Sequence, residues 1–355
     1  MPRLQANALL LLAALIWGSA FVGQAWGMDS MVPLTFTGLC FLLGAAVVAP
    51  LAWREWRSLV AVGNPPSGEH AKGIALLGGL LCAGVVMQQV GLMTTTVTNA
   101  GFLTALYAPL VPVLAWALEK RTPGRPKCFS FPSGGQSPQG GGLGGDLEKR
   151  TLGRPKRFSS PSGGWSPQGG GLGGDVQLQA PHWTVWPAAA GCLVGTWLLT
   201  GAAPQSPQVG DSWLLASAAP WAVHVLLVGR AANRLRGAYV LACGQFLVCA
   251  VIALPLGLAT EPIDLDGLRR AAGAIAYTGV LSVGVGFTLQ VVGQRHTRAS
   301  DSAIVLSSKT VFAALFGAAF MGDRLGPTGL AACGLILLCI VLVQTVPALQ
   351  PSLRP

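Results

Sequence analysis

The stretch QQVGLMTTTVTNAGFLTALYAPLVPVLA (Gln88–Ala115) aligns without a gap with QVVGQRHTRASDSAIVLSSKTVFAALFG (Gln290–Gly317), which begins 202 residues later. In both copies a short polar linker separates two apolar segments. The linker is uncharged in the first copy (Thr94–Thr96) and carries arginine in the second (Arg295–Arg298). The chain is therefore predicted to consist of two related halves. The identical pairs are Gln88 and Gln290, Val90 and Val292, Gly91 and Gly293, and Thr95 and Thr297.

The composition predicts an integral membrane protein. Of the 355 residues, 52% are hydrophobic and only 10% are charged, whereas a soluble domain carries about 25% charged residues. Apolar runs of about 17–25 residues are long enough to cross a bilayer as helices. The first run continues without a clear cleavage site, which favours an uncleaved helix over a signal peptide. The sequence thus predicts an all-α integral membrane protein with ten transmembrane helices. The predicted spans are residues 5–26, 33–53, 73–93, 99–118, 185–201, 212–229, 238–258, 271–293, 301–321 and 328–346.

The net charge of +10 does not indicate a nucleic-acid partner, because the basic residues are placed asymmetrically. With a cytoplasmic N-terminus, ten basic residues outside the 119–184 loop fall on the cytoplasmic side and three on the other. This positive-inside pattern predicts a multi-pass protein of a plasma membrane, such as a bacterial inner membrane, with both termini cytoplasmic. Anionic lipid headgroups are incidental partners of these residues. The ten are Arg3, Arg54, Arg57, Lys72, Arg230, Arg234, Arg236, Arg295, Arg298 and Arg354, and the three are Arg269, Arg270 and Arg324.

Equivalent loops of the two halves differ in charge, which indicates that the halves are inverted relative to one another. The loop after the first predicted helix carries only Asp29, whereas its equivalent after the sixth carries three arginines between residues 230 and 236. The basic loop after the fourth helix corresponds to one after the ninth with only Asp323 and Arg324. An odd number of spans per half requires this inversion. Inverted repeats with a midplane binding site are typical of secondary transporters.

A long loop interrupts the first predicted repeat. Its Gly, Ser, Pro and Gln content predicts a disordered cytoplasmic segment. A phosphate-binding loop is not indicated, because no strand and helix flank the glycines, while a partner-binding role for the tract LEKRTxGRPK stays open. Leu118–Asp146 and Leu147–Asp175 are tandem copies of 29 residues. The predicted units are residues 1–123 (first repeat, four helices), 124–180 (the loop), 181–203 (the fifth helix), 211–346 (second repeat) and 347–355 (cytoplasmic tail).

No metal, cofactor or disulfide is predicted. The sequence has eight cysteines but no CxxC pair, and no histidine lies near them at metal-ligand spacing. Cys128 lies in the long loop, on the reducing side of the membrane, where a disulfide is not expected. The other seven fall within predicted spans and are interpreted as small packing residues.

Five stretches carry a family resemblance: LLLLAALIWGSAFVGQ (Leu9–Gln24), PLTFTGLCFLLGA (Pro33–Ala45), NAGFLTALYAPLVPVLAW (Asn99–Trp116), SAIVLSSKTVFAALFGAAFMGDRLGP (Ser302–Pro327) and TGLAACGLILLCIVLV (Thr328–Val343). They resemble helices one, two, four, nine and ten of EamA-type members of the drug/metabolite transporter superfamily. The resemblance covers nearly the whole chain except 124–180. It implies two inverted five-helix repeats, cytoplasmic termini, and export or exchange of small metabolites. Cys40 stands where the family often has Arg, and Lys309 where it often has Glu.

Lys309 is the most informative single residue. It lies eight residues beyond Asp301, about 12 Å deep and near the middle of a bilayer core of about 30 Å. A lysine there costs about 2.5–3.5 kcal/mol on insertion scales. Its repeat equivalent Tyr107 is equally deep from the other side, so the two are predicted to meet near the midplane. Lys309 is either a cavity ammonium that attracts a substrate carboxylate or a structural lysine that is bonded to helix carbonyls or uncharged.

Other polar or aromatic side chains within the spans are weaker candidates for substrate binding. Each of them lines a cavity or forms contacts between helices, and hydrogen bonds of that kind contribute about 0.6–2 kcal/mol. Gln88 and Gln290 occupy equivalent positions, so one cavity could hold both. His224 is either a proton carrier or an interhelical contact, and Trp17 either stacks on substrate or packs. The remaining candidates are Gln24 and Gln245.

The sequence therefore predicts a secondary transporter that exports or exchanges a small organic metabolite such as an amino acid. It would work by alternating access at a midplane cavity between the two repeats. Its predicted partners are that metabolite and the lipid bilayer, and the chain acts as a monomer or homodimer. An intramembrane enzyme is not indicated, because no catalytic motif surrounds His224, Ser307 or Ser308. A receptor or scaffold that uses the long loop is the remaining alternative.

Overall fold

The computed structural model describes residues 1–120, 183–199, 209–262, 264–322 and 326–349. These residues are helical apart from short turns, and no β-strand occurs among them. The predicted disordered loop at 124–180, with its duplicated tract and Cys128, lies outside the described residues. So do residues 350–355 of the predicted tail.

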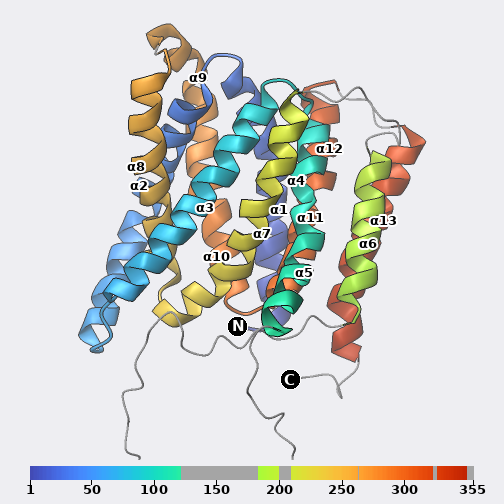
Figure 1. Ribbon diagram of the computed structural model, residues 1–355, viewed down its shortest axis with the longest axis horizontal. Coiled ribbons are helices and arrows are strands. Elements are labelled where there is room, and N and C mark those ends of the chain that lie inside the picture. The colour runs from blue at the N-terminus through green and yellow to red at the C-terminus, as the bar shows by residue number, and fades with distance from the viewer. Residues whose placement is uncertain (121–182, 200–208, 263, 323–325, 350–355) are drawn as a thin grey trace, which may run out of the picture. The chain divides into compact units, whose positions relative to one another are not determined.

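The helices follow the predicted spans, and most are longer than predicted (Figure 1). The exception is α6, which is described only to Leu199 of the predicted 185–201. The predicted tail at 347–355 begins within a helix, because α13 continues to Leu349. The elements are α1 (Arg3–Met28), α2 (Pro33–Ala61), α3 (Gly68–Leu92), α4 (Val97–Ala105), α5 (Tyr107–Lys120), α6 (Val185–Leu199), α7 (Val209–Leu235), α8 (Ala238–Thr260), α9 (Leu265–Tyr277), the π-helix η1 (Thr278–Phe287), α10 (Thr288–Gln294), α11 (Ala299–Ser307), α12 (Lys309–Phe320) and α13 (Pro327–Leu349).

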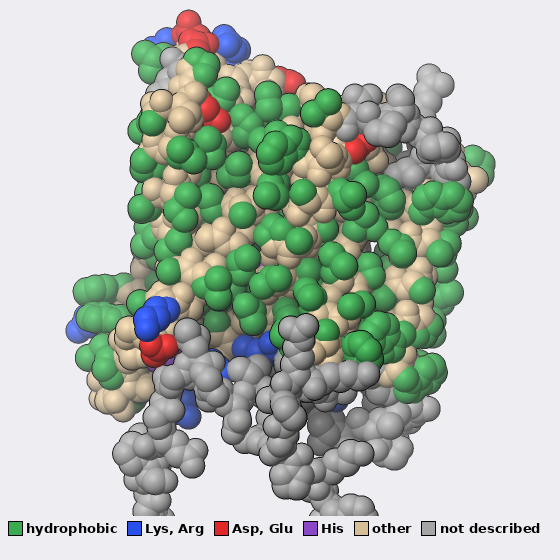
Figure 2. All heavy atoms as spheres, viewed as in Figure 1, with side chains coloured by type: hydrophobic (Ala, Val, Ile, Leu, Met, Phe, Trp, Pro, Cys, Tyr) green, Lys and Arg blue, Asp and Glu red, His purple; other side chains and the backbone are tan. Residues whose placement is uncertain are grey.

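Length and composition give the described residues eight helical segments that can cross a membrane and two shorter apolar helices, Val185–Leu198 and Pro327–Val343. Together these correspond to the ten predicted spans. Figure 2 shows hydrophobic side chains over the middle of one face of the molecule, with charged side chains near its two ends. Such a band is expected where lipid tails surround the helices.

The fourth and ninth predicted spans are each broken at equivalent positions. The breaks lie at Leu106 and Ser308, which separate α4 from α5 and α11 from α12. In the first copy, Pro109 has no N–H to donate to the carbonyl of residue 105. In the second, the hydroxyls of Ser307 and Ser308 donate to carbonyls three residues earlier at 2.6 and 2.7 Å, a competition that bends helices. Different local chemistry therefore gives the same break.

The helices α2 and α8 form an antiparallel pair in which each caps the other. Glu261, which follows α8, accepts hydrogen bonds from the backbone N–H groups of Leu34 (2.9 Å) and Thr35 (2.8 Å) at the start of α2. Glu55, near the end of α2, accepts from the N–H groups of Ala238 (3.0 Å) and Val240 (2.9 Å) at the start of α8. Since α2 and α8 are equivalent helices of the two repeats, this reciprocal contact confirms the predicted inversion.

The same two-fold relation holds for the other helices. The helix α3 packs on α7, and η1 with α10 packs on α1. Gly91 and Gly293, identical in the aligned stretches, allow these close approaches. A Cβ at Gly91 would lie 3.0 Å from the carbonyl oxygen of Gly210, and one at Gly293 would lie 3.2 Å from that of Ala6. Contacts also join α4 to α12, α5 to α11, and α6 to α13.

Each end of the bundle has a polar latch, and the two are related by the repeat. We call the end where α1 begins the amino-terminal side. There, Arg3 of α1 pairs with Asp301 of α11 at 2.7 Å. On the opposite side, Asn99 of α4 donates to Asp211 of α7 at 2.7 Å, and Thr95 donates to the same oxygen at 3.1 Å. In both latches, the start of one repeat's first helix contacts the start of the other repeat's fourth.

Replacement of Glu261 by alanine is expected to destabilise the fold. The change leaves two helix N–H groups without their acceptor, which costs roughly 1–3 kcal/mol. We expect a clearly lower apparent Tm in detergent. Glu69→Ala is the matched control, because Glu69 forms an exposed pair with Lys72 at 2.8 Å, and such pairs contribute little. Equal Tm values for the two variants would contradict the capping role.

Candidate functional site

Lys309 is the first residue of α12, directly after the helix break, and is only 4% exposed. Its Nζ atom lies 4.9 Å from the ring centroid of Tyr107, 5.5 Å from Trp221 and 5.9 Å from Phe21. The structure thus brings the equivalent residues Tyr107 and Lys309 together. Among the described residues, no carboxylate pairs with Lys309 and no group accepts a hydrogen bond from it.

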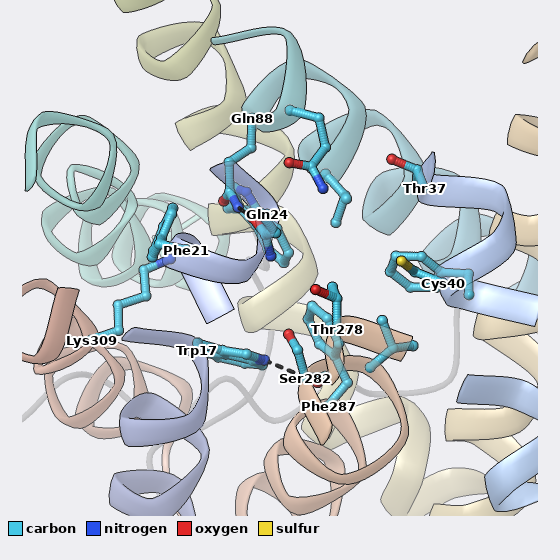
Figure 3. Close-up of a pocket in the computed structure, with 15 residues that line it drawn as sticks. Trp17, Phe21, Gln24, Thr37, Cys40, Gln88, Thr278, Ser282, Phe287 and Lys309 are labelled. Carbon is cyan, nitrogen blue, oxygen red and sulfur yellow. Dashed lines mark hydrogen bonds between the residues drawn. The ribbon is translucent and has the colours of Figure 1, made fainter. Parts of the chain in front are cut away.

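A cavity lies beside Lys309 between three helices of the first repeat and three elements of the second (Figure 3). Its volume is about 30 Å³, which is room for about one or two water molecules. The lining combines aromatic rings with neutral polar side chains and a single charge. Its residues are Trp17, Phe21, Gln24, Thr37, Cys40, Phe41, Val85, Gln88, Gln89, Trp221, Thr278, Ser282, Val283, Phe287 and Lys309.

Aromatic rings form one wall of the cavity. Phe287 lies at their centre: it is stacked on Trp221 with centroids 5.8 Å apart and planes 4° apart, and it lies 4.7 Å from Trp17 and 6.0 Å from Phe41. Phe287 ends the π-helix η1, and π-helical segments are frequent at functional sites. Trp17 Nε1 donates to the carbonyl of Ser282 at 3.3 Å, so α1 is fixed to η1 at this wall (Figure 3).

Four predicted site residues line this cavity, and four do not. Lys309, Trp17, Gln24 and Gln88 line it, and Gln88 Nε2 donates to Gln24 Oε1 at 3.0 Å (Figure 3). Tyr107 reaches the site only through its contact with Lys309.

The other three predicted residues lie away from the lining. His224 Nε2 of α7 lies 3.0 Å from Gln245 Oε1 of α8. This is the contact between helices that the sequence offered as one alternative for His224. Gln290 is fully buried in α10, and neither atom of its amide has a hydrogen-bond partner among the described residues. The cavity therefore does not hold both Gln88 and Gln290, because only Gln88 is part of its lining.

Sequence reasoning missed much of the lining, including Phe21, Phe41, Trp221, Phe287 and the threonines. A signal for Trp221 is present in the repeat. Gly84 and Gly286 are 202 residues apart, and a Cβ at Gly84 would meet Trp221 while one at Gly286 would meet Trp17. Trp17 and Trp221, which are 204 residues apart, thus pack on equivalent glycines from the first helices of the two repeats. No such signal exists for Phe287, because the direction of its side chain depends on the π-helix that it ends.

The fold and site together define a class. Two inverted sets of membrane-spanning helices enclose a largely buried cavity at their interface, which is the architecture of membrane transporters. Among the described residues, no group of three or more His, Cys, Asp or Glu side chains is placed to hold a metal ion.

Comparison with known proteins identifies the family. The EamA-like transporter family matches residues 4–131 and 208–345, one match in each half. The chain belongs to this family and is a multi-pass membrane transporter. It is 24% identical over 343 residues to an uncharacterized transporter from Archaeoglobus fulgidus, covering 96% of this chain and 86% of that protein. A solved crystal structure has the same fold, with a TM-score of 0.64 and 16% identity over 97% of this chain and 98% of that one.

Close packing of α1 on α12 positions Lys309 beside the cavity, and Gly18 makes it possible. A Cβ at Gly18 would collide with the Cβ of Phe312 and lie 2.9 Å from the backbone nitrogen of Ala313. We expect Gly18→Ala to lower the apparent Tm and to reduce transport, because α12 must move away. Gly79→Ala is the control, since nothing lies within 4 Å of its added Cβ. An equal effect of both substitutions would contradict this account.

Proposed function

We propose that this protein is a secondary transporter of a small organic metabolite whose carboxylate binds Lys309. One observation carries the proposal: the buried amino group of Lys309 lies beside a cavity, within 6 Å of three aromatic ring centroids, and has no ion-pair or hydrogen-bond partner among the described residues. A lysine at midplane depth costs about 2.5–3.5 kcal/mol. Each ring contact contributes about 0.5–2 kcal/mol, so the rings offset part of that cost. An anionic ligand would supply the missing counter-charge.

We further propose that the two halves give access alternately from the two sides. The latches support this, since each connects first and fourth helices of different repeats at one end of the cavity. Opening of one side would require the latch on that side to break. The reciprocal caps between α2 and α8 act at both ends of one helix pair. This helix pair is therefore suited to stay in contact while the two latches break in turn.

Export or exchange is the mode we propose, across a plasma membrane with both termini cytoplasmic. The basic residues on the amino-terminal side of the spans support this orientation. The acidic groups near the spans already have partners: Glu55 and Glu261 cap helices, and Asp211 and Asp301 belong to the latches. Coupling to an ion through an intramembrane carboxylate is therefore less well supported than uniport or exchange.

The substitution Lys309→Met tests the binding role. It removes the charge at similar length, so we expect flux in proteoliposomes to fall at least tenfold while the apparent Tm stays equal or rises. A functional residue that costs stability gives this combination. The control is Lys72→Met, an exposed lysine remote from the cavity. Candidate compounds come from metabolite profiles of cells with and without the protein. Unchanged flux in Lys309→Met would refute the proposal.

The latches can be tested through Cys40, which lines the cavity and is 1% exposed. We expect Arg3→Ala to increase its modification by an impermeant methanethiosulfonate added on the amino-terminal side. Asn99→Ala is expected to increase modification from the opposite side. Mass spectrometry of the Cys40 peptide measures both in oriented vesicles. The same change from both sides, or none, would show that these contacts do not control access.

A further inference from the structure

We infer that the cavity selects carboxylates that lack an ammonium group, such as hydroxy acids, over amino acids of the same shape. This inference rests on the proposed binding of a carboxylate to Lys309 and narrows the substrate class. Three features support it: the charge of the lining, the position of that charge, and the neutral polar atoms that remain without partners.

The lining carries a single charge. Lys309 is its only ionisable residue apart from the thiol of Cys40, and it includes no Asp or Glu. A bound monocarboxylate would therefore leave the buried site neutral. A zwitterionic amino acid would bring one charge of each sign and leave the site with a net positive charge, which is unfavourable in a medium of low dielectric constant.

The position of Lys309 adds a second penalty for an ammonium group. In an amino acid, the ammonium is bonded to the carbon next to the carboxylate, so it would be held close to Nζ once the carboxylate is bound. Like charges at such a distance repel, and burial strengthens the repulsion. The rings of Tyr107, Trp221 and Phe21 lie within 6 Å of Nζ, and none of them carries a negative charge.

Neutral polar atoms in the lining indicate what the rest of the ligand offers. Trp221 Nε1, Gln89 Oε1, Thr37 Oγ1 and Thr278 Oγ1 are buried and have no hydrogen-bond partner among the described residues. Buried polar atoms normally have partners, so these atoms are available to a ligand or to water. Trp221 Nε1 can only donate, whereas the hydroxyls donate or accept. A hydroxyl group on the ligand can accept from Trp221 Nε1, donate to Gln89 Oε1, or do either with the threonine hydroxyls, and it adds no charge.

The arrangement in Figure 3 separates the two kinds of contact. Lys309 lies at one end of the view beside Phe21 and Trp17, and Thr37 lies at the other end beyond Thr278. A ligand with its carboxylate at Lys309 would therefore direct its remaining groups toward the threonines. Rings of Trp17 and Phe287 flank the path between them and suit a carbon skeleton.

The test uses matched pairs that differ only in having a hydroxyl or an ammonium at the same carbon. The pairs are lactate and alanine, phenyllactate and phenylalanine, and gluconate and 2-amino-2-deoxygluconate. Binding to the full-length purified protein is measured by calorimetry at neutral pH, where every carboxylate is ionised. We expect the hydroxy acid to bind at least tenfold more tightly in one pair or more, and Lys309→Met to abolish that binding. Lys72→Met should leave it unchanged.

Each outcome has a separate meaning. If the amino acid binds as tightly as its hydroxy partner in every pair that binds, and Lys309→Met abolishes both, the selectivity is wrong but the proposed function stands. If binding persists in Lys309→Met, or if no compound of any pair binds, the proposed carboxylate site is itself overturned. Thr37→Val adds an independent readout, because it should weaken gluconate about tenfold, the effect of losing one buried hydrogen bond, and leave lactate unaffected.

Discussion

The first backbone N–H groups of a helix have no acceptor within that helix, so where they are buried the protein must supply acceptors itself. In this structure, two glutamates do so reciprocally. Glu261 caps α2 and Glu55 caps α8, and each glutamate belongs to the helix that the other one caps. This arrangement ties the two repeats together in antiparallel register. The cavity lies next to this pair and depends on it, because α2 contributes Thr37, Cys40 and Phe41 to its lining.

The arrangement of the helices is nearly symmetric, but the residues that they bring to the cavity are not. Trp17 and Trp221 occupy equivalent places, as do Gly84 and Gly286, so both halves contribute similar walls. The equivalent residues Tyr107 and Lys309 differ, and they meet with the ammonium 4.9 Å from the ring centroid. A two-fold frame thus places one charge at the interface of two similar halves. The charge that we assign to the site comes from this departure from symmetry.

The two latches show the same combination of symmetry and difference. Both join a first helix to the fourth helix of the other repeat. One is an ion pair between Arg3 and Asp301, and the other is an amide and hydroxyl contact to Asp211. Ion pairs near a surface are screened by salt, whereas hydrogen bonds from neutral groups respond less. The two latches therefore differ in physical character, one being an ion pair and the other a set of hydrogen bonds from neutral groups.

The sequence by itself determined the membrane class, the ten helices and the inverted repeat. Hydrophobic run length, loop charge and a fixed offset are properties of the linear chain, and they needed no packing information. Only the tertiary structure decided which side chains share the cavity. It placed Gln88 there and excluded Gln290, and it added Phe287 through a π-helix. The physical reason is that a cavity lining depends on helix rotation and on local breaks such as Leu106 and Ser308, which are set by contacts between helices distant in the chain.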